Sequence, residues 1–117
     1  AILFAKEGAD IAISYLNEHE DARETKSIIE DTYQRQCILI PGDLGTEPKC
    51  VKAVKQVIRQ FKRMDILVNN AAIHYQRKSL EDITTRDMLK TFQTNIFSYI
   101  WITKAALPFL KIFLFRQ

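Results

Sequence analysis

The chain has 117 residues, of which 47% are hydrophobic and 26% are charged, and its formal net charge is +3. Such a composition is typical of one ordinary globular domain with enough apolar side chains for a core. Because basic and acidic residues are interleaved along the whole chain, we expect neither a nucleic acid nor an anionic membrane surface as a partner.

The chain opens in a segment typical of the last turns of an amphipathic helix, and Gly8 is predicted to end this helix through a left-handed cap. Residues 10–15 are short, apolar and suited to a strand that is covered on both faces. Asn17 then offers an N-cap to the next helix, with Glu20 three residues later completing a capping box. This helix is predicted to continue to Thr32 on a thin apolar stripe.

A second buried strand is predicted at residues 37–40, where Pro41 and Gly42 end it and turn the chain outward. Thr46 is predicted to cap the following helix, which carries a proline in its first turn. Its apolar side chains recur at helical spacing as far as Phe61, so this helix has one face for the core.

Residues 65–69 form a third short apolar run, which predicts another buried strand. After a loop over residues 72–83, Thr84 begins a long helical pattern that reaches Leu107. Residues 96–110 are apolar nearly all round, which is rare on the surface of a monomer. This stretch is shorter than the about 20 residues of a membrane span and contains a lysine, so it is interpreted as a buried or interface helix.

Strand and helix signals alternate three times along the chain. This alternation predicts the α/β class, with a Rossmann-like doubly wound parallel sheet and right-handed crossovers. In such a sheet, ligands bind beyond the carboxyl ends of the strands. The candidate site therefore lies in the segments that follow the three predicted strands, which are residues 15–17, 42–44 and 69–72.

The three segments, taken together, carry a family resemblance. Asp43-Leu44 and Asn69-Asn70-Ala71-Ala72 resemble, in order and spacing, the adenine-binding pair and the NNAG motif of the classical short-chain dehydrogenase/reductase family. The resemblance runs from the helix before Gly8 to about Lys111. Two sequence segments, residues 39–44 and 103–108, are most similar to bacterial aldehyde-reductase-like and general-stress oxidoreductases. It implies that residues 1–117 are an incomplete NAD(P)-binding Rossmann domain of a cytoplasmic enzyme.

The same resemblance implies the roles of the cofactor-binding residues. Asp43 would accept a hydrogen bond from the adenine amino group, and the backbone amide of Leu44 would contact a ring nitrogen. Asn70 would lie nearest the ribose and nicotinamide. Ala71 and Ala72 complete the motif, and Ala72 stands where the family usually has glycine, so a methyl group is added where the backbone nears the cofactor.

Thr94-Asn95-Ile96 matches a further family motif in the long helix. Asn95 is therefore the catalytic candidate, which in the family holds a water through its backbone in a proton relay. An asparagine in mid-helix also indicates a local irregularity, because it competes for backbone hydrogen bonds. No tyrosine here has a lysine four residues later, so none of Ser79, Ser98 and Tyr99 is assigned a catalytic role.

The glycine-rich TGxxxGxG loop and the family's serine and YxxxK pair are expected to lie before residue 1 and after residue 117. We expect the chain alone to be inactive. The resemblance implies a parent enzyme that transfers hydride between a nicotinamide and a small carbonyl or alcohol substrate. Residues 111–117 lack the small turn residues expected before a further strand, and a truncated or frame-shifted sequence is a hypothesis for this tail.

The choice of cofactor depends on the end of the first predicted strand, where an acidic residue would bind the ribose hydroxyls of NAD. Tyr15 occupies that place, and residues 14–16 contain no acid. NADP is therefore permitted and favoured over NAD, although no basic residue is there to hold its 2′-phosphate. Glu18 lies close enough to oppose this choice.

Other reactive side chains give weaker signals. His74, just past the Asn-Asn-Ala-Ala segment, either lines a substrate pocket or is an exposed loop residue. Cys37 and Cys50 form no CxxC pair and are expected to be buried thiols in a reducing cytosol. No group of potential ligands has metal-binding spacing, so no catalytic metal is predicted.

The long helix over residues 85–110 resembles the family's dimerisation helix, and a homo-oligomer is expected through it. The alternative function is a non-enzymatic protein that self-associates or binds a partner through residues 96–110. A phospho-acceptor signalling domain using Asp43 is a third hypothesis, but the first predicted strand ends without the acidic pair that would hold magnesium.

Overall fold

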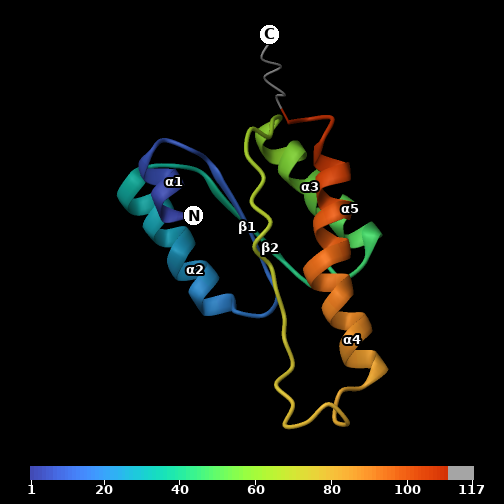
Figure 1. Ribbon diagram of the computed structural model, residues 1–117. Coiled ribbons are helices and arrows are strands. Elements are labelled where there is room, and N and C mark those ends of the chain that lie inside the picture. The colour runs from blue at the N-terminus through green and yellow to red at the C-terminus, as the bar shows by residue number, and fades with distance from the viewer. Residues whose placement is uncertain (111–117) are drawn as a thin grey trace, which may run out of the picture. The chain divides into compact units, whose positions relative to one another are not determined.

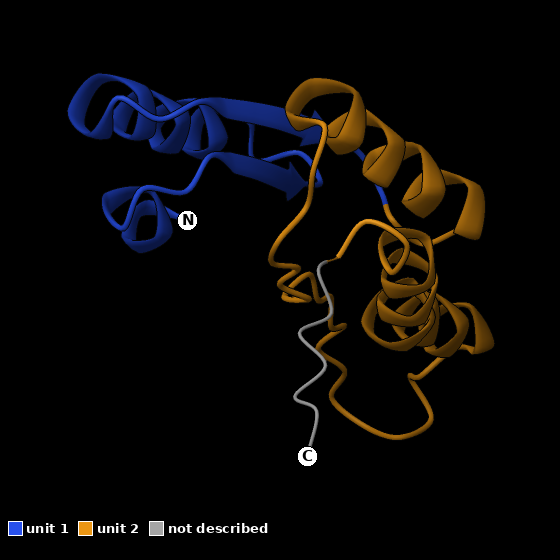
Figure 2. Ribbon diagram, turned by 90° about the horizontal axis from the view of Figure 1, so that it is seen from above, with its two compact units in different colours: residues 1–43 blue, residues 44–117 orange. Residues whose placement is uncertain are grey.

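The computed structural model describes residues 1–110, and the chain divides into two compact units at Asp43 and Leu44 (Figure 2). The tail at residues 111–117, for which the sequence suggested a departure from the family, lies outside the described residues.

The first unit contains α1 (Ile2–Lys6), β1 (Ile11–Tyr15), α2 (His19–Ser27), the π-helical turn η1 (Ile28–Thr32) and β2 (Cys37–Pro41). β1 and β2 pair in parallel, with Ile11 opposite Cys37 and Tyr15 opposite Pro41. Figure 1 shows α2 beside the two strands, and α2 packs on β2. The core is built from the buried side chains of Ala5, Ile29 and Cys37. Both predicted strands and the helix between them are confirmed. The expected covering of the first strand on both faces is wrong, because half-buried and exposed side chains alternate along β1.

Gly8 ends α1 as predicted. Its φ of +94° lies in the region that favours glycine. The N–H of Gly8 donates to the carbonyl of Ala5 at 2.9 Å, and the N–H of Ala9 donates to the carbonyl of Phe4 at 3.0 Å. These two bonds form a Schellman motif, which satisfies carbonyls that the last helical turn would leave without donors.

The capping box predicted for Asn17 and Glu20 is wrong. The N-cap of α2 is Glu18, with no side-chain capping bond. The backbone carbonyl of Asn17 accepts from the N–H of His19 at 2.9 Å, while the carboxylate of Glu18 accepts from the N–H groups of Leu16 and Asn17. The N–H of Asn17, which the predicted capping box assigned to Glu20, is therefore bonded by the adjacent glutamate instead.

The second unit contains α3 (Glu47–Phe61), α4 (Thr85–Phe92), the π-helical turn η2 (Gln93–Phe97) and α5 (Ser98–Ala106). Figure 1 shows α3 and α5 side by side, and Val54, Met64 and Ala106 form the buried core between and beside them. Thr46 is the N-cap of α3 as predicted, although its side chain makes no capping bond. Thr84 caps α4 through a complete capping box with Asp87.

The third predicted strand is not formed among the described residues. Residues 65–69 are not in a strand, and the nearest pairing is an isolated parallel bridge between Met64, just before them, and Leu110. Ile66 and Val68, predicted to be buried, are 60% and 62% exposed. A strand is stable only when its backbone groups are paired, and in the described part of the chain the two-stranded sheet of β1 and β2 does not extend to this segment. The fold class remains α/β with a parallel sheet.

Candidate functional site

The carboxyl end of the sheet brings the ends of β1 and β2 together within the first unit. The N–H of Gly42 donates to the carbonyl of Tyr15 at 2.8 Å, which places the start of the turn after β2 beside the last residue of β1. Gly42 has a φ of +133°, so the turn needs a residue without Cβ. Tyr15 and Asp43, two of the sequence-predicted cofactor residues, are both half-buried at this edge.

Tyr15 also contacts the first turn of α2. Its hydroxyl lies 3.1 Å from Nδ1 of His19, and the two rings meet edge to face at a centroid distance of 5.4 Å. In the loop that joins these two residues, the carboxylate of Glu18 accepts from the N–H of Asn17 at 3.1 Å and from that of Leu16 at 3.2 Å. The backbone hydrogen bond from Asn17 is the main cause of a lowered pKa of Glu18. The loop after β1 therefore carries a fixed negative charge.

Leu44 is held by α3 in the second unit. The thiol of Cys50 lies 3.1 Å from the carbonyl oxygen of Leu44, to which it donates, and 3.9 Å from that of Ser98. Cys50 is fully buried, as the sequence predicted, and so is Cys37. Asp43 and Leu44 belong to different units, so their joint contact with one adenine ring stays a prediction.

The Asn-Asn-Ala-Ala segment is fixed by α5. The hydroxyl of Tyr99 donates to the carbonyl of Ala71 at 2.8 Å, and the side-chain amide of Asn69 donates to the hydroxyl of Thr103 at 3.1 Å. Asn70 and Ala72 are exposed. These two residues therefore remain accessible to a ligand while their neighbours are tied to the helix.

Asn95 lies in η2, which confirms the local irregularity that its mid-helix position suggested. Its Oδ1 accepts from the N–H of Ile73 and its Nδ2 donates to the carbonyl of the same residue, both at 2.8 Å. π-Helical turns inside α-helices are frequent at functional sites. The side chain of Asn95 thus fixes the segment directly after Ala72.

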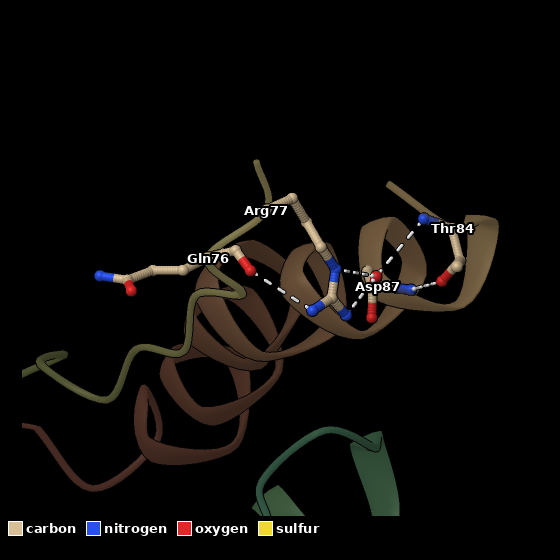
Figure 3. Close-up of polar contacts among 4 residues, drawn as sticks. All are labelled: Gln76, Arg77, Thr84 and Asp87. Atoms are coloured by element: carbon tan, nitrogen blue, oxygen red, sulfur yellow. Dashed lines mark hydrogen bonds and ion pairs between the residues drawn. The ribbon is translucent and has the colours of Figure 1, made fainter. Parts of the chain in front are cut away.

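Beyond this segment, Arg77 anchors the loop to the start of α4 (Figure 3). Its Nε and Nη2 donate to Oδ2 of Asp87 at 3.0 Å and 2.7 Å, and the same oxygen accepts from the N–H of Thr84. The guanidinium is also 5.5 Å from the ring centroid of Tyr75. Hydrogen bonding from Arg77 is the main cause of a lowered pKa of Asp87.

Sequence reasoning missed Tyr99, Thr103 and the Arg77–Asp87 pair. The available signal was spacing, because Asn95, Tyr99 and Thr103 recur at intervals of four residues and therefore share one face of the helix. No group of three potential metal-ligating side chains occurs within residues 1–110. In the same range, the helices are too short and too polar to cross a membrane.

Comparison with known proteins relates the whole arrangement to one family. A family model described as short chain dehydrogenase matches residues 1–113. Uncharacterized oxidoreductase YhdF of Bacillus subtilis is 54% identical over 111 residues, which cover 95% of this chain and 38% of that protein. NADPH-dependent aldehyde reductase 1, chloroplastic, of Arabidopsis thaliana is 38% identical over 113 residues, covering 92% of this chain and 39% of that protein.

Among solved structures, a short chain dehydrogenase from Burkholderia cenocepacia in complex with NADP is similar with a TM-score of 0.86 and 35% identity. The match covers 92% of this chain and 43% of the other. The chain thus spans well under half the length of the proteins it matches, which agrees with the predicted partial Rossmann-like domain.

Proposed function

We propose, because the chain belongs to the short-chain dehydrogenase family, that the protein containing it is an NAD(P)-dependent oxidoreductase. It transfers hydride between the nicotinamide and a small carbonyl or alcohol substrate. The observation that carries the proposal is the pair of hydrogen bonds between the side chain of Asn95 and the backbone of Ile73, because it fixes the backbone directly beyond the motif assigned to the cofactor. A pre-positioned backbone loses little entropy when a ligand binds.

The residues present fit a nicotinamide dinucleotide. Asn70, Ala71 and Ala72 are exposed, so the methyl group of Ala72 does not close the approach to the backbone. Asn70 is assigned to the ribose and nicotinamide end, and Asp43 with Leu44 to the adenine. When bound, the nicotinamide supplies or accepts the hydride.

Asn95 is assigned as the catalytic-tetrad asparagine of this chain. Both polar atoms of its side chain bond to Ile73, and its backbone carbonyl, within the π-helical turn η2, is the group that would hold a water. The proton that the reaction moves would pass through this water. The general acid or base itself is not assigned to these residues, since none of the chain's tyrosines precedes a lysine by four positions.

NADP is the proposed cofactor, with NAD as the alternative. A similar solved structure holds NADP, and one similar relative is named an NADPH-dependent aldehyde reductase. These names also favour an aldehyde as the carbonyl substrate. The fixed negative charge of Glu18 in the loop after β1 opposes a 2′-phosphate and is the observation that favours NAD.

Isothermal titration of the full-length protein with NADPH and NADH tests the proposal. We expect Asp43→Ala and Asn70→Ala each to weaken binding, and Lys52→Ala, an exposed position on α3, to leave it unchanged. Absence of binding to the folded protein by either nucleotide would refute the function. Binding that neither substitution weakens would refute the residue assignment.

We further propose that the protein is a cytoplasmic homo-oligomer that associates through the helical stretch over residues 85–110, which contains α4, η2 and α5. Large apolar side chains are exposed there, among them Ile96 at 48%, Ile100 at 61% and Leu107 at 51%. Exposed apolar surface of this kind is typical of an interface. Ile100→Glu is expected to yield a monomer in sedimentation analysis, whereas an unchanged oligomer would contradict this interface.

The same apolar face supports the second candidate, a non-enzymatic protein that binds itself or a partner. Association without any nucleotide binding would favour this alternative. In the enzymatic proposal, residues 1–117 form part of one NAD(P)-binding domain, and the two compact units are pieces of it.

A further inference from the structure

The two peptide bonds on either side of Ala72 are each held by one helical side chain. The hydroxyl of Tyr99, in α5, donates to the carbonyl of Ala71 at 2.8 Å. The side chain of Asn95, in η2, accepts from the N–H of Ile73 at the same distance. Tyr99 and Asn95 are four residues apart, so they lie on one helical face. Two side chains of this face therefore fix two consecutive peptide planes.

These two bonds determine where the polar groups of Ala72 point. In a planar trans peptide, the carbonyl of one residue and the N–H of the next point in opposite directions, and the described residues contain no cis peptide. Because the carbonyl of Ala71 faces Tyr99, the N–H of Ala72 points away from the helical face. Because the N–H of Ile73 faces Asn95, the carbonyl of Ala72 also points away from it.

Ala72 thus offers a donor and an acceptor on one side of the backbone. Within the described part of the chain, neither of these groups has a hydrogen-bond partner, and the residue is exposed. A ligand that both donates and accepts fits such a pair, and hydroxyl groups do both. The ribose on the nicotinamide side of the cofactor carries hydroxyl groups of this kind.

The alanine that stands for the family's usual glycine is compatible with this role. Among the described residues other than glycine, only Gln34 and Lys62 have a positive φ. Ala72 therefore has a backbone conformation that is open to residues with a Cβ. Its methyl group adds no backbone strain at this position.

The helix that carries Tyr99 is a firm base for positioning. Ser98, directly before it, is 1% exposed, and its hydroxyl donates to the carbonyl of Thr94 at 2.5 Å. Ala106, at the other end of α5, is fully buried in the core of the second unit. Removal of the Tyr99 hydroxyl alone should therefore leave the helix in place and release only the peptide that the hydroxyl holds.

We infer that Tyr99 is a positioning residue, whose hydroxyl orients the peptide between Ala71 and Ala72 for the nicotinamide half of the cofactor. The inference rests on the proposed oxidoreductase function. Asn95 fixes only the peptide that follows Ala72. Without the Tyr99 hydroxyl, the preceding peptide can rotate and turn the N–H of Ala72 away from the ligand.

The test compares the two halves of the cofactor by isothermal titration of the full-length protein. Tyr99→Phe keeps the ring and loses the hydroxyl, and we expect it to bind NADPH about 3- to 10-fold more weakly, the range of one net hydrogen bond. Binding of AMP, which lacks the nicotinamide half, should be unchanged. Tyr33→Phe is the matched control, because Tyr33 packs against the core of the first unit, and it should change neither affinity.

The AMP measurement separates positioning from general stability. Equal weakening of NADPH and AMP binding in Tyr99→Phe would show a general loosening and would overturn the inference. NADPH binding as tight as that of the parent would overturn it as well. A folded parent protein that binds no nicotinamide nucleotide would overturn the proposed function instead.

Amide chemical shifts provide a second readout that needs no activity. Saturating NADPH should shift the amide resonance of Ala72 in the parent, and this shift should be smaller in Tyr99→Phe. The shift of the Leu44 amide, assigned to the adenine, should be the same in both proteins. A shift of the Ala72 amide that is equal in the two proteins would contradict the role of the hydroxyl.

Discussion

The side-chain amide of Asn95 replaces a neighbouring strand for Ile73, because it binds both the N–H and the carbonyl of that residue at 2.8 Å. The two residues are separated by 22 positions in the chain, and the contact ties the extended segment after the Asn-Asn-Ala-Ala motif to the π-helical turn η2. A backbone that lacks a sheet neighbour is thus satisfied by one asparagine.

Removal of this amide should loosen the segment. We expect Asn95→Ala to lower the free energy of unfolding by about 1–3 kcal/mol, because two backbone groups lose their partner. Hydrogen exchange of the Ile73 amide should accelerate more than that of amides in α3. Gln93→Ala in the same turn is the control, and equal effects of both substitutions would show that the loss belongs to the turn itself.

Asn95→Asp separates the two bonds. A carboxylate still accepts from the N–H of Ile73 but repels its carbonyl oxygen. At neutral pH, the free energy of unfolding of this variant should therefore lie between those of the parent and Asn95→Ala, or below that of Asn95→Ala. Stability that equals the parent would argue that the bond to the Ile73 carbonyl contributes nothing.

The Arg77–Asp87 pair should persist in moderately acidic solution. The pKa of Asp87 is lowered in the folded protein, mainly by the hydrogen bonds from Arg77. The stabilisation is therefore fully present above the unfolded carboxyl pKa of about 3.9, and it is lost as the pH falls through the folded pKa. A carboxyl NMR titration should therefore place the pKa of Asp87 below the ordinary value of an aspartate. Arg77→Met should raise the pKa of Asp87 toward its ordinary value, whereas Lys78→Met should change it little.

Cys50 should matter for adenine binding more than its small size suggests. Its thiol donates to the carbonyl of Leu44, so we expect Cys50→Ala to weaken binding of AMP about 2- to 5-fold, the order of one S–H···O bond. Cys50→Ser retains a donor and should bind nearly as well as the parent. Calorimetry with AMP provides the measurement.

Val54→Ala is the matched control for Cys50, because Val54 is also buried on α3 but packs on Met64 and Ala106 instead of the Leu44 loop. It should lower stability by about 1–3 kcal/mol and leave AMP binding unchanged. If Val54→Ala weakens AMP binding as much as Cys50→Ala does, the effect is one of general stability.

Glu18 should oppose the 2′-phosphate of NADP. Its carboxylate already holds the N–H groups of Leu16 and Asn17, and its lowered pKa keeps it ionised above moderately acidic pH. Glu18→Gln should therefore improve NADPH affinity severalfold relative to NADH. Fluorescence titration with both nucleotides measures the ratio, Glu7→Gln after α1 is the control, and an unchanged ratio would place the 2′-phosphate elsewhere.

The sequence predicted the local elements well where one short-range rule decided them. Gly8 ends α1 because only a residue without Cβ readily takes its positive φ, and the parallel strands β1 and β2 follow from two short apolar runs that flank a helix. The capping box of Asn17 was wrong: the N–H of Asn17, which Glu20 was predicted to bind, donates to the carboxylate of Glu18.

By itself, the sequence determined the family and the motif residues, including Asp43, Asn70 and Asn95, since these depend on order and spacing along the chain. The tertiary structure decided how residues 65–77 are held. Their apolar run looked like a buried strand, but within the described residues they are held by side chains of helical residues 10 to 34 positions away. Among these contacts, the backbone of Ala71 bonds to Tyr99 and that of Ile73 to Asn95. Such long-range pairing depends on two different periodicities meeting in space, which no local pattern records.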